Sequence, residues 1–232
     1  MGVSMENQKR RVVRRRIFAV AAGGAALGVG VAATLAAWTD TEWVFGGDGA
    51  GGPGVGTSTF AIEQNTDPGF DAAAWTDEAD NPGGEMVFTA AGLVGTELTP
   101  GDSVYAAVAL RTKAASIAGD VELQPAVPAA GITTADAGGL LFDALDVRVA
   151  TSATAFTCDG SAFTGGATII ADGTLSGTGG SVTQSLSAAS GSVQYYCFEV
   201  TLPDPIPLAG GTTAEDYMGR TIAPAWEFVA TS

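Results

Sequence analysis

From residue 57 onward, short segments with the apolar and polar pattern typical of β-strands alternate with turn signals. SVYAAVALRT (103–112) begins directly after the turn sequence PGD, and LDVRVATSATAF (145–156) repeats the alternation. SVQYYCFEVTLP (192–203) has the most closely spaced aromatic and apolar residues of these segments. Further strands are predicted at residues 57–65, 85–90, 120–127 and 221–232.

The predicted strands are short, and turn-forming residues separate them. Apolar residues do not recur with the 3.6-residue period of a long helix, and only residues 133–144 are expected to form a short helical turn. Roughly seven to nine strands with this spacing are typical of two packed antiparallel sheets. We therefore predict an all-β domain over residues 57–232, a jelly-roll-like β-sandwich.

The N-terminal part has the pattern of a secretory signal. Residues 17–37 carry no charge, and they follow a basic segment, residues 9–16. The uncharged segment is also long enough to span a bilayer, so a retained anchor is the alternative. Its many Ala and Gly residues favour a signal peptide over residues 1–37. Cleavage is expected next to three residues: Ala36, Ala37 and Trp38.

An aromatic peptide and a glycine-rich linker, residues 38–56, separate this signal from the domain. The peptide could donate a β-strand to a sheet edge of another copy. Two other interpretations are a peptidase recognition sequence followed by a disordered tail, and a strand that pairs with its own domain. The linker should behave as a coil with an end-to-end distance of about 15–20 Å. The candidate donor residues are Trp38, Thr39, Thr41, Trp43 and Phe45.

The charge is distributed unevenly along the chain. The chain contains ten basic and 25 acidic residues and no histidine, and its formal net charge is −15. The first 37 residues hold six cations and one carboxylate, so the remaining residues carry a net charge of −20. A surface this acidic repels nucleic-acid phosphates and anionic lipid headgroups, so we expect no nucleic-acid partner.

Catalytic chemistry has little support in the sequence. No histidine can act as a base for a serine or threonine nucleophile, or as a metal ligand. The loop at residues 67–85 contains carboxylates that could bind Ca²⁺, but their spacing does not match a calcium loop, and a solvated loop is favoured. We predict no catalytic residue, no cofactor and no metal site.

Cys158 and Cys197 are the two cysteines of the chain. Export places them in an oxidising compartment, where a disulfide between them would close a loop of about 40 residues. Such a loop contributes roughly 3–4 kcal/mol to stability in the chain-entropy model. Two buried free thiols, or a bond between molecules, are the alternatives.

Several stretches together resemble a known family. GVAATLAAWTD (30–40) resembles the alternative signal peptide that a SipW-type signal peptidase processes. LTPGDS (98–103) resembles a turn of the TasA/camelysin family. The ending, YMGRT (217–221) and WEFVATS (226–232), is similar to that family's terminal strand, although a Gln-Gly is more usual than Met218-Gly219.

The resemblance implies a secreted jelly-roll protein of the cell surface or biofilm matrix, with a SipW-type signal peptidase as a partner. Family members form fibres by donating an N-terminal strand to the next subunit. Some are named metallopeptidases, but this sequence lacks H-E-x-x-H and every imidazole ligand, so peptidase activity is not carried over. We expect an exported structural protein that contacts the membrane only through residues 17–37 before cleavage. A membrane-anchored extracellular binding module is the alternative.

Overall fold

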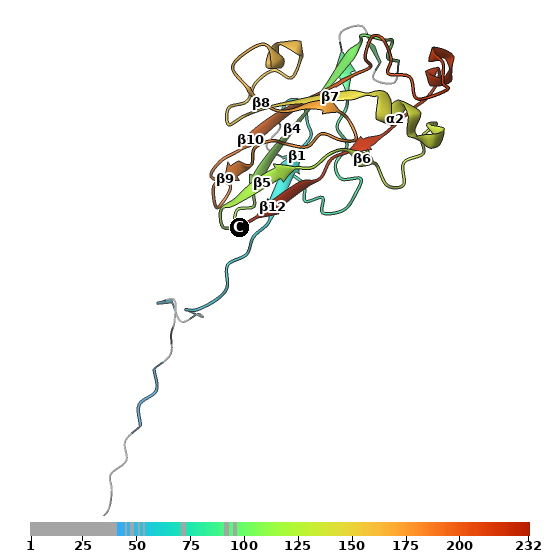
Figure 1. Ribbon diagram of the computed structural model, residues 1–232. Helices are drawn as coiled ribbons and strands as arrows, with labels where there is room; N and C mark the ends of the chain where they lie inside the picture. Colours follow the sequence, from blue (N-terminus) through green and yellow to red (C-terminus); the bar gives the residue numbers. More distant parts are fainter. Residues whose placement is uncertain are drawn as a thin grey trace, which may run out of the picture. The chain divides into compact units, whose positions relative to one another are not determined.

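The computed structural model describes residues 41–44, 46, 49–50, 52, 54–70, 73–90, 93–94 and 97–232 (Figure 1). The chain divides into two units, residues 1–56 and 57–232, and all strands and helices given below belong to the second. The predicted signal peptide and its cleavage residues lie outside the described residues. Within the described residues, no helix has both the length and the apolar character needed to cross a membrane.

The larger sheet has seven strands, and all of its strand pairs are antiparallel. Its order is β3-β2-β4-β10-β7-β8, and β1 pairs with the C-terminal end of β4. The strands are β1 (Ile62–Asn65), β2 (Thr89–Ala90), β3 (Leu93–Val94), β4 (Ser103–Thr112), β7 (Asp146–Ser152), β8 (Thr168–Thr174) and β10 (Gln194–Thr201).

The smaller layer has two short sheets. One has the order β12-β5-β9, and the other pairs β11 with β6. The amide of Gln124 donates to the carbonyl of Glu227 at 2.9 Å and links the two sheets into one surface. The strands are β5 (Gly119–Leu123), β6 (Val127–Pro128), β9 (Gln184–Leu186), β11 (Pro224–Ala225) and β12 (Phe228–Thr231). The all-β sandwich predicted from the sequence is therefore confirmed, while its jelly-roll type stays a prediction.

The alternation of buried and exposed residues explains why one face of each strand lies in the core between the two layers. In β4, residues at every second position are buried, among them Val104, Val108 and Leu110, which are at most 2% exposed. Phe198 and Val200 of β10 join the same cluster between the sheets. Burying each large apolar side chain contributes about 1.5–3 kcal/mol, so this cluster between the sheets stabilises the fold.

β10 is buried on both faces, which simple alternation does not predict. Phe198 faces the sandwich core, whereas Cys197 faces outward and is also 0% exposed. The outer face is covered because segment 153–167, between β7 and β8, folds back over it. Phe163 of this segment forms a second apolar cluster with Ala150 and Cys197 of the sheet.

Several predicted boundaries differ from the structure. The strand predicted at 145–156 ends at Ser152, the one at 120–127 breaks after Leu123, and the one at 85–90 is reduced to Thr89–Ala90. The turn predicted at 133–144 is present as a 3-10 helix, η1 (Ala137–Gly139), followed by α2 (Leu140–Ala144). Two further 3-10 helices are η2 (Gly160–Phe163) and η3 (Ala214–Tyr217).

Candidate functional site

The outer edge of β12 presents backbone groups that no other strand uses. In an antiparallel pair, residues alternate between hydrogen-bonded and non-hydrogen-bonded positions. Glu227 is hydrogen-bonded to Gln124, so the register places the amides and carbonyls of Phe228 and Ala230 on the side away from β5. Among the described residues, these four groups have no hydrogen-bond partner. β12 is thus an open edge strand.

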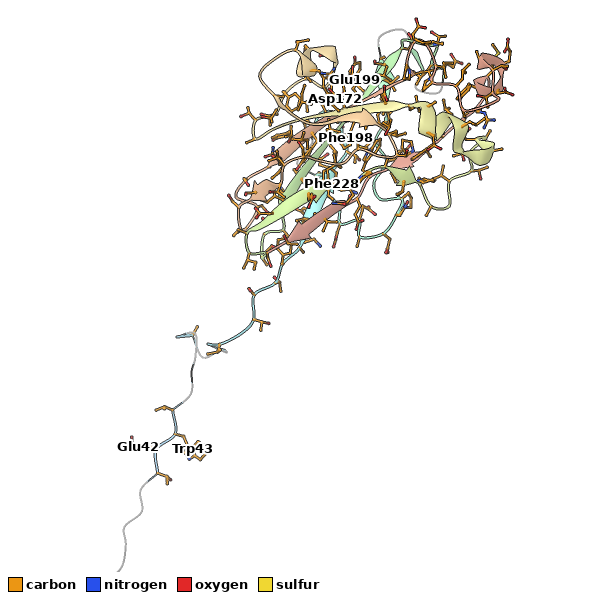
Figure 2. All side chains as sticks on the ribbon, viewed as in Figure 1. Glu42, Trp43, Asp172, Phe198, Glu199 and Phe228 are labelled. Atoms are coloured by element: carbon orange, nitrogen blue, oxygen red, sulfur yellow. A yellow bond between two sulfur atoms is a disulfide. The ribbon has the colours of Figure 1, made fainter. Side chains whose placement is uncertain are left out.

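Aromatic side chains line the core beside this edge. Trp226 packs against Phe198 with ring centroids 4.7 Å apart, and the ring of Phe228 lies 4.9 Å from that of Tyr196. Figure 2 labels Phe198 and Phe228. The inner rings, Tyr196 and Phe198, are at most 1% exposed, whereas Trp226, Phe228 and Phe88 are only half-buried. The sandwich core is therefore less completely covered along β12 than at its centre.

Two buried polar atoms lie in this aromatic layer without a partner among the described residues. They are the indole N–H of Trp226 and the hydroxyl of Tyr196. Burial raises the pKa of the Tyr196 hydroxyl far above its usual value. Leaving a buried donor unsatisfied costs about 1–3 kcal/mol.

The candidate donor peptide is described only in part. Thr41, Trp43 and Val44 form no strand, and Trp43 and Val44 are each 95% exposed (Figure 2). Trp38, Thr39 and Phe45 lie outside the described residues. The prediction that this peptide donates a strand is therefore neither confirmed nor contradicted.

The predicted disulfide is present. Cys158 and Cys197 are joined, with an S–S distance of 1.98 Å and Cα atoms 5.1 Å apart. The bond connects segment 153–167 to the middle of β10, since Cys197 pairs with Ala107 of β4 on one side and with Ala150 of β7 on the other.

A polar cluster next to the disulfide was not found by sequence reasoning. Arg148 Nη1 lies 3.0 Å from Glu199 Oε2, and the Tyr105 hydroxyl donates to Glu199 Oε1 at 2.9 Å. The Arg148 guanidinium also lies over the Phe163 ring, 4.7 Å from its centroid. Burial, and then the Glu199 carboxylate, raise the pKa of Tyr105. The signal that could have revealed the cluster is the charge at outward-facing positions of strands otherwise rich in apolar residues.

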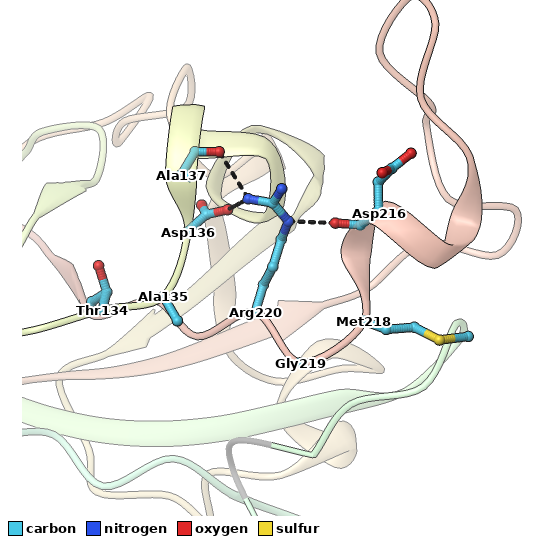
Figure 3. A pocket seen from close by; sticks show the side chains of 8 residues that line it. All are labelled: Thr134, Ala135, Asp136, Ala137, Asp216, Met218, Gly219 and Arg220. Atoms are coloured by element: carbon cyan, nitrogen blue, oxygen red, sulfur yellow. Dashed lines mark hydrogen bonds and ion pairs between the residues drawn. The ribbon is translucent and has the colours of Figure 1, made fainter.

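A surface hollow lies between the loop before η1 and the segment after η3 (Figure 3). Arg220 donates through Nη1 to Asp136 at 2.8 Å and to the Ala137 carbonyl at 2.9 Å. Burial alone would raise the pKa of Asp136, but hydrogen bonds from the amides of Leu141 and Phe142 and from Arg220 lower it. Arg220 and Asp136 therefore pair with each other and hold two loops together. Neither of these two charged groups is free to bind a ligand.

The acidic loop at 67–85 is tied partly to the domain. Asp77 forms an ion pair with Lys113, and the Asn81 side chain hydrogen-bonds the backbone of Pro128 and Ala130. In the part of the chain that the structure describes, no three acidic or cysteine side chains come together as metal ligands. The preferred interpretation of this segment remains a solvated loop.

Comparisons with known proteins give no family assignment. No family model matches the chain, and no curated protein matches its sequence. The resemblance to the TasA/camelysin family therefore rests on the short motifs described above.

Proposed function

We propose that this protein is a secreted or cell-surface structural protein, and that copies assemble when the peptide 38–45 of one adds as a strand to β12 of the next. The observation that carries the proposal is the open edge of β12, whose outward amides and carbonyls at Phe228 and Ala230 adjoin half-buried aromatic rings. Edge strands with unpaired groups are the usual sites for β-strand addition.

The exposed peptide has the properties of an occupant. Trp43 is 95% exposed, and burying one large apolar side chain contributes about 1.5–3 kcal/mol. In an added strand, Thr41 and Trp43 would share one face and Val44 would lie on the other. The linker, residues 46–56, spans roughly 15–20 Å as a coil, which suits transfer to a neighbouring copy.

Charge opposes this assembly. Residues 38–232 carry a net charge of −20, so two copies repel each other at low ionic strength. At about 0.15 M salt the Debye length falls to roughly 8 Å, and most of this repulsion is screened. We therefore expect assembly to increase with salt, because salt weakens the charge repulsion more than it weakens strand pairing and aromatic burial.

The test compares two adjacent substitutions in a protein that begins at Trp38. Trp43→Ser should abolish concentration-dependent oligomers in sedimentation velocity, whereas Val44→Ser should reduce them less. Both side chains are 95% exposed, so neither change should alter the stability of the domain. Filaments of the unchanged protein should be visible by electron microscopy.

A substitution on the acceptor side completes the test. Ala230→Pro removes an N–H that points away from β5, so the β5–β12 pairing can persist while strand addition is blocked. A protein that stays monomeric at every concentration and salt level would refute assembly. Recovery from membranes with residues 17–37 retained would favour the anchored binding module instead.

A further inference from the structure

Segment 153–167 covers the outer face of the larger sheet. Its Phe163 is 8% exposed and lies 6.2 Å from the Tyr105 ring, measured between centroids. The Arg148 guanidinium lies on the same Phe163 ring. The cover therefore hides Cys197, Ala150 and most of the Glu199 side chain, which is 10% exposed.

The cover is held without backbone hydrogen bonds to the strands beneath it. Its amides bond within the segment, as from Ala162 to the Asp159 carbonyl at 3.0 Å and from Thr164 to the Ser161 carbonyl at 3.2 Å. At its start, Thr154 bonds the neighbouring Ser152 hydroxyl. What attaches the cover to the sheet is side-chain packing and the disulfide.

The sandwich does not depend on the cover for its own core. The cluster between the two sheets contains no residue of segment 153–167. β10 keeps both of its strand neighbours along its length, with Gln194–Thr201 paired to β4 and Tyr195–Thr201 paired to β7. Loss of the cover would therefore remove one layer from the outer face and leave the two-sheet core intact.

We propose that the Cys158–Cys197 disulfide keeps segment 153–167 closed over the sheet. Its reduction opens this segment as a unit while the sandwich stays folded. Cys158 is half-buried whereas Cys197 is 0% exposed, so a thiolate attacks the sulfur of Cys158. Cys197 leaves as a thiolate and takes up a proton. With a dithiol reductant, its second thiol then displaces Cys158, and the reductant ends as a cyclic disulfide.

Opening changes the chemistry of the outer face. The strip formed by Ala150 and Cys197 becomes accessible, and the Glu199 side chain, 10% exposed beneath the cover, becomes more accessible to water. The uncovered strip therefore combines apolar surface with the Arg148–Glu199 ion pair in an otherwise acidic domain.

The test uses the folded full-length chain with and without dithiothreitol. Chymotrypsin should cut after Phe163 at least about tenfold faster once the disulfide is reduced, because local opening exposes the site. Iodoacetamide should then modify two thiols under native conditions. Far-ultraviolet circular dichroism and the amide protection of β4 and β10 should remain. A Cys158→Ala, Cys197→Ala double variant should be cut fast without reductant, and dithiothreitol should not change it further.

Two results would overturn the proposal. If reduction leaves the Phe163 site protected and Cys197 unreactive, packing alone holds segment 153–167 on the sheet, and the disulfide does not control its opening. If β4, β10 and the cover lose protection together, the disulfide supports the whole fold rather than one segment.

Discussion

Gly119, at the start of β5, is a position where a single methyl group should destabilise the domain. A Cβ at this residue would lie 2.4 Å from Cε2 of Phe60 and 2.4 Å from the carbonyl oxygen of Thr231. Real Cβ atoms do not approach other atoms this closely. Gly119→Ala therefore forces the Phe60 ring, in the segment before β1, and the end of β12 to move.

The size of the effect follows from which neighbours can move. Adding a methyl group to a packed site costs about 1–3 kcal/mol. The Phe60 ring can rotate away, but the Thr231 oxygen belongs to the β5–β12 ladder and moves only if that pairing changes. We therefore expect a loss near the upper end, about 3 kcal/mol, or a decrease in Tm of roughly 6–12 °C for a domain of this size.

Guanidinium and thermal unfolding, followed by circular dichroism, measure this loss. Gly210→Ala is the matched control, because a Cβ there has no atom within 4 Å. Phe60→Ala combined with Gly119→Ala should recover part of the loss, since one of the two close contacts is removed. Equal stabilities of Gly119→Ala and Gly210→Ala would refute the packing argument.

Three further changes test other parts of the domain. Asp136→Asn should flatten the acid side of the stability curve: the pKa of Asp136 is lowered in the folded state, so its contribution is present above about pH 4 and lost as pH falls through the folded pKa, which Tm measured from pH 2 to 7 would show. Phe198→Ala should cost about 3–5 kcal/mol in denaturant unfolding, because this ring is 0% exposed and packs on Trp226. Thr112→Val should cost about 1–3 kcal/mol by the same assay, since a 0% exposed hydroxyl that bonds the loop after β9 is lost.

The fold could be predicted where one face of a strand meets water and the other meets the core. β4 was found with its exact bounds, Ser103–Thr112, because its alternation is regular and the turn before it is clear. β8 (Thr168–Thr174) was missed because it is exposed at four of its seven positions and contains Gly173, so its sequence carries little periodicity. Short strands such as β9 are fixed by their partners rather than by their own residues.

Only the disulfide of the candidate site could be predicted from the residues themselves. Two cysteines in a chain that is predicted to be exported predict a disulfide without any knowledge of geometry. The Arg148–Glu199–Tyr105 cluster depends on three strands meeting under a folded-back segment. The charges of Arg148 and Glu199 in apolar strands are a signal for it, but they do not show which strands are neighbours. The open edge of β12 follows from sheet order, which a single sequence does not determine.

The four cations of the domain explain why the proposed contact between copies would have to be made by uncharged groups. Each is paired with a carboxylate of its own chain: Arg111 with Glu63, Lys113 with Asp77, Arg148 with Glu199 and Arg220 with Asp136. No cation in residues 57–232 is left to attract the acidic surface of another copy. Backbone groups of an edge strand and aromatic side chains carry no net charge, so they can join two such surfaces once salt screens the carboxylates. The open edge of β12 and the exposed Trp43 are the features of the described chain that meet this requirement.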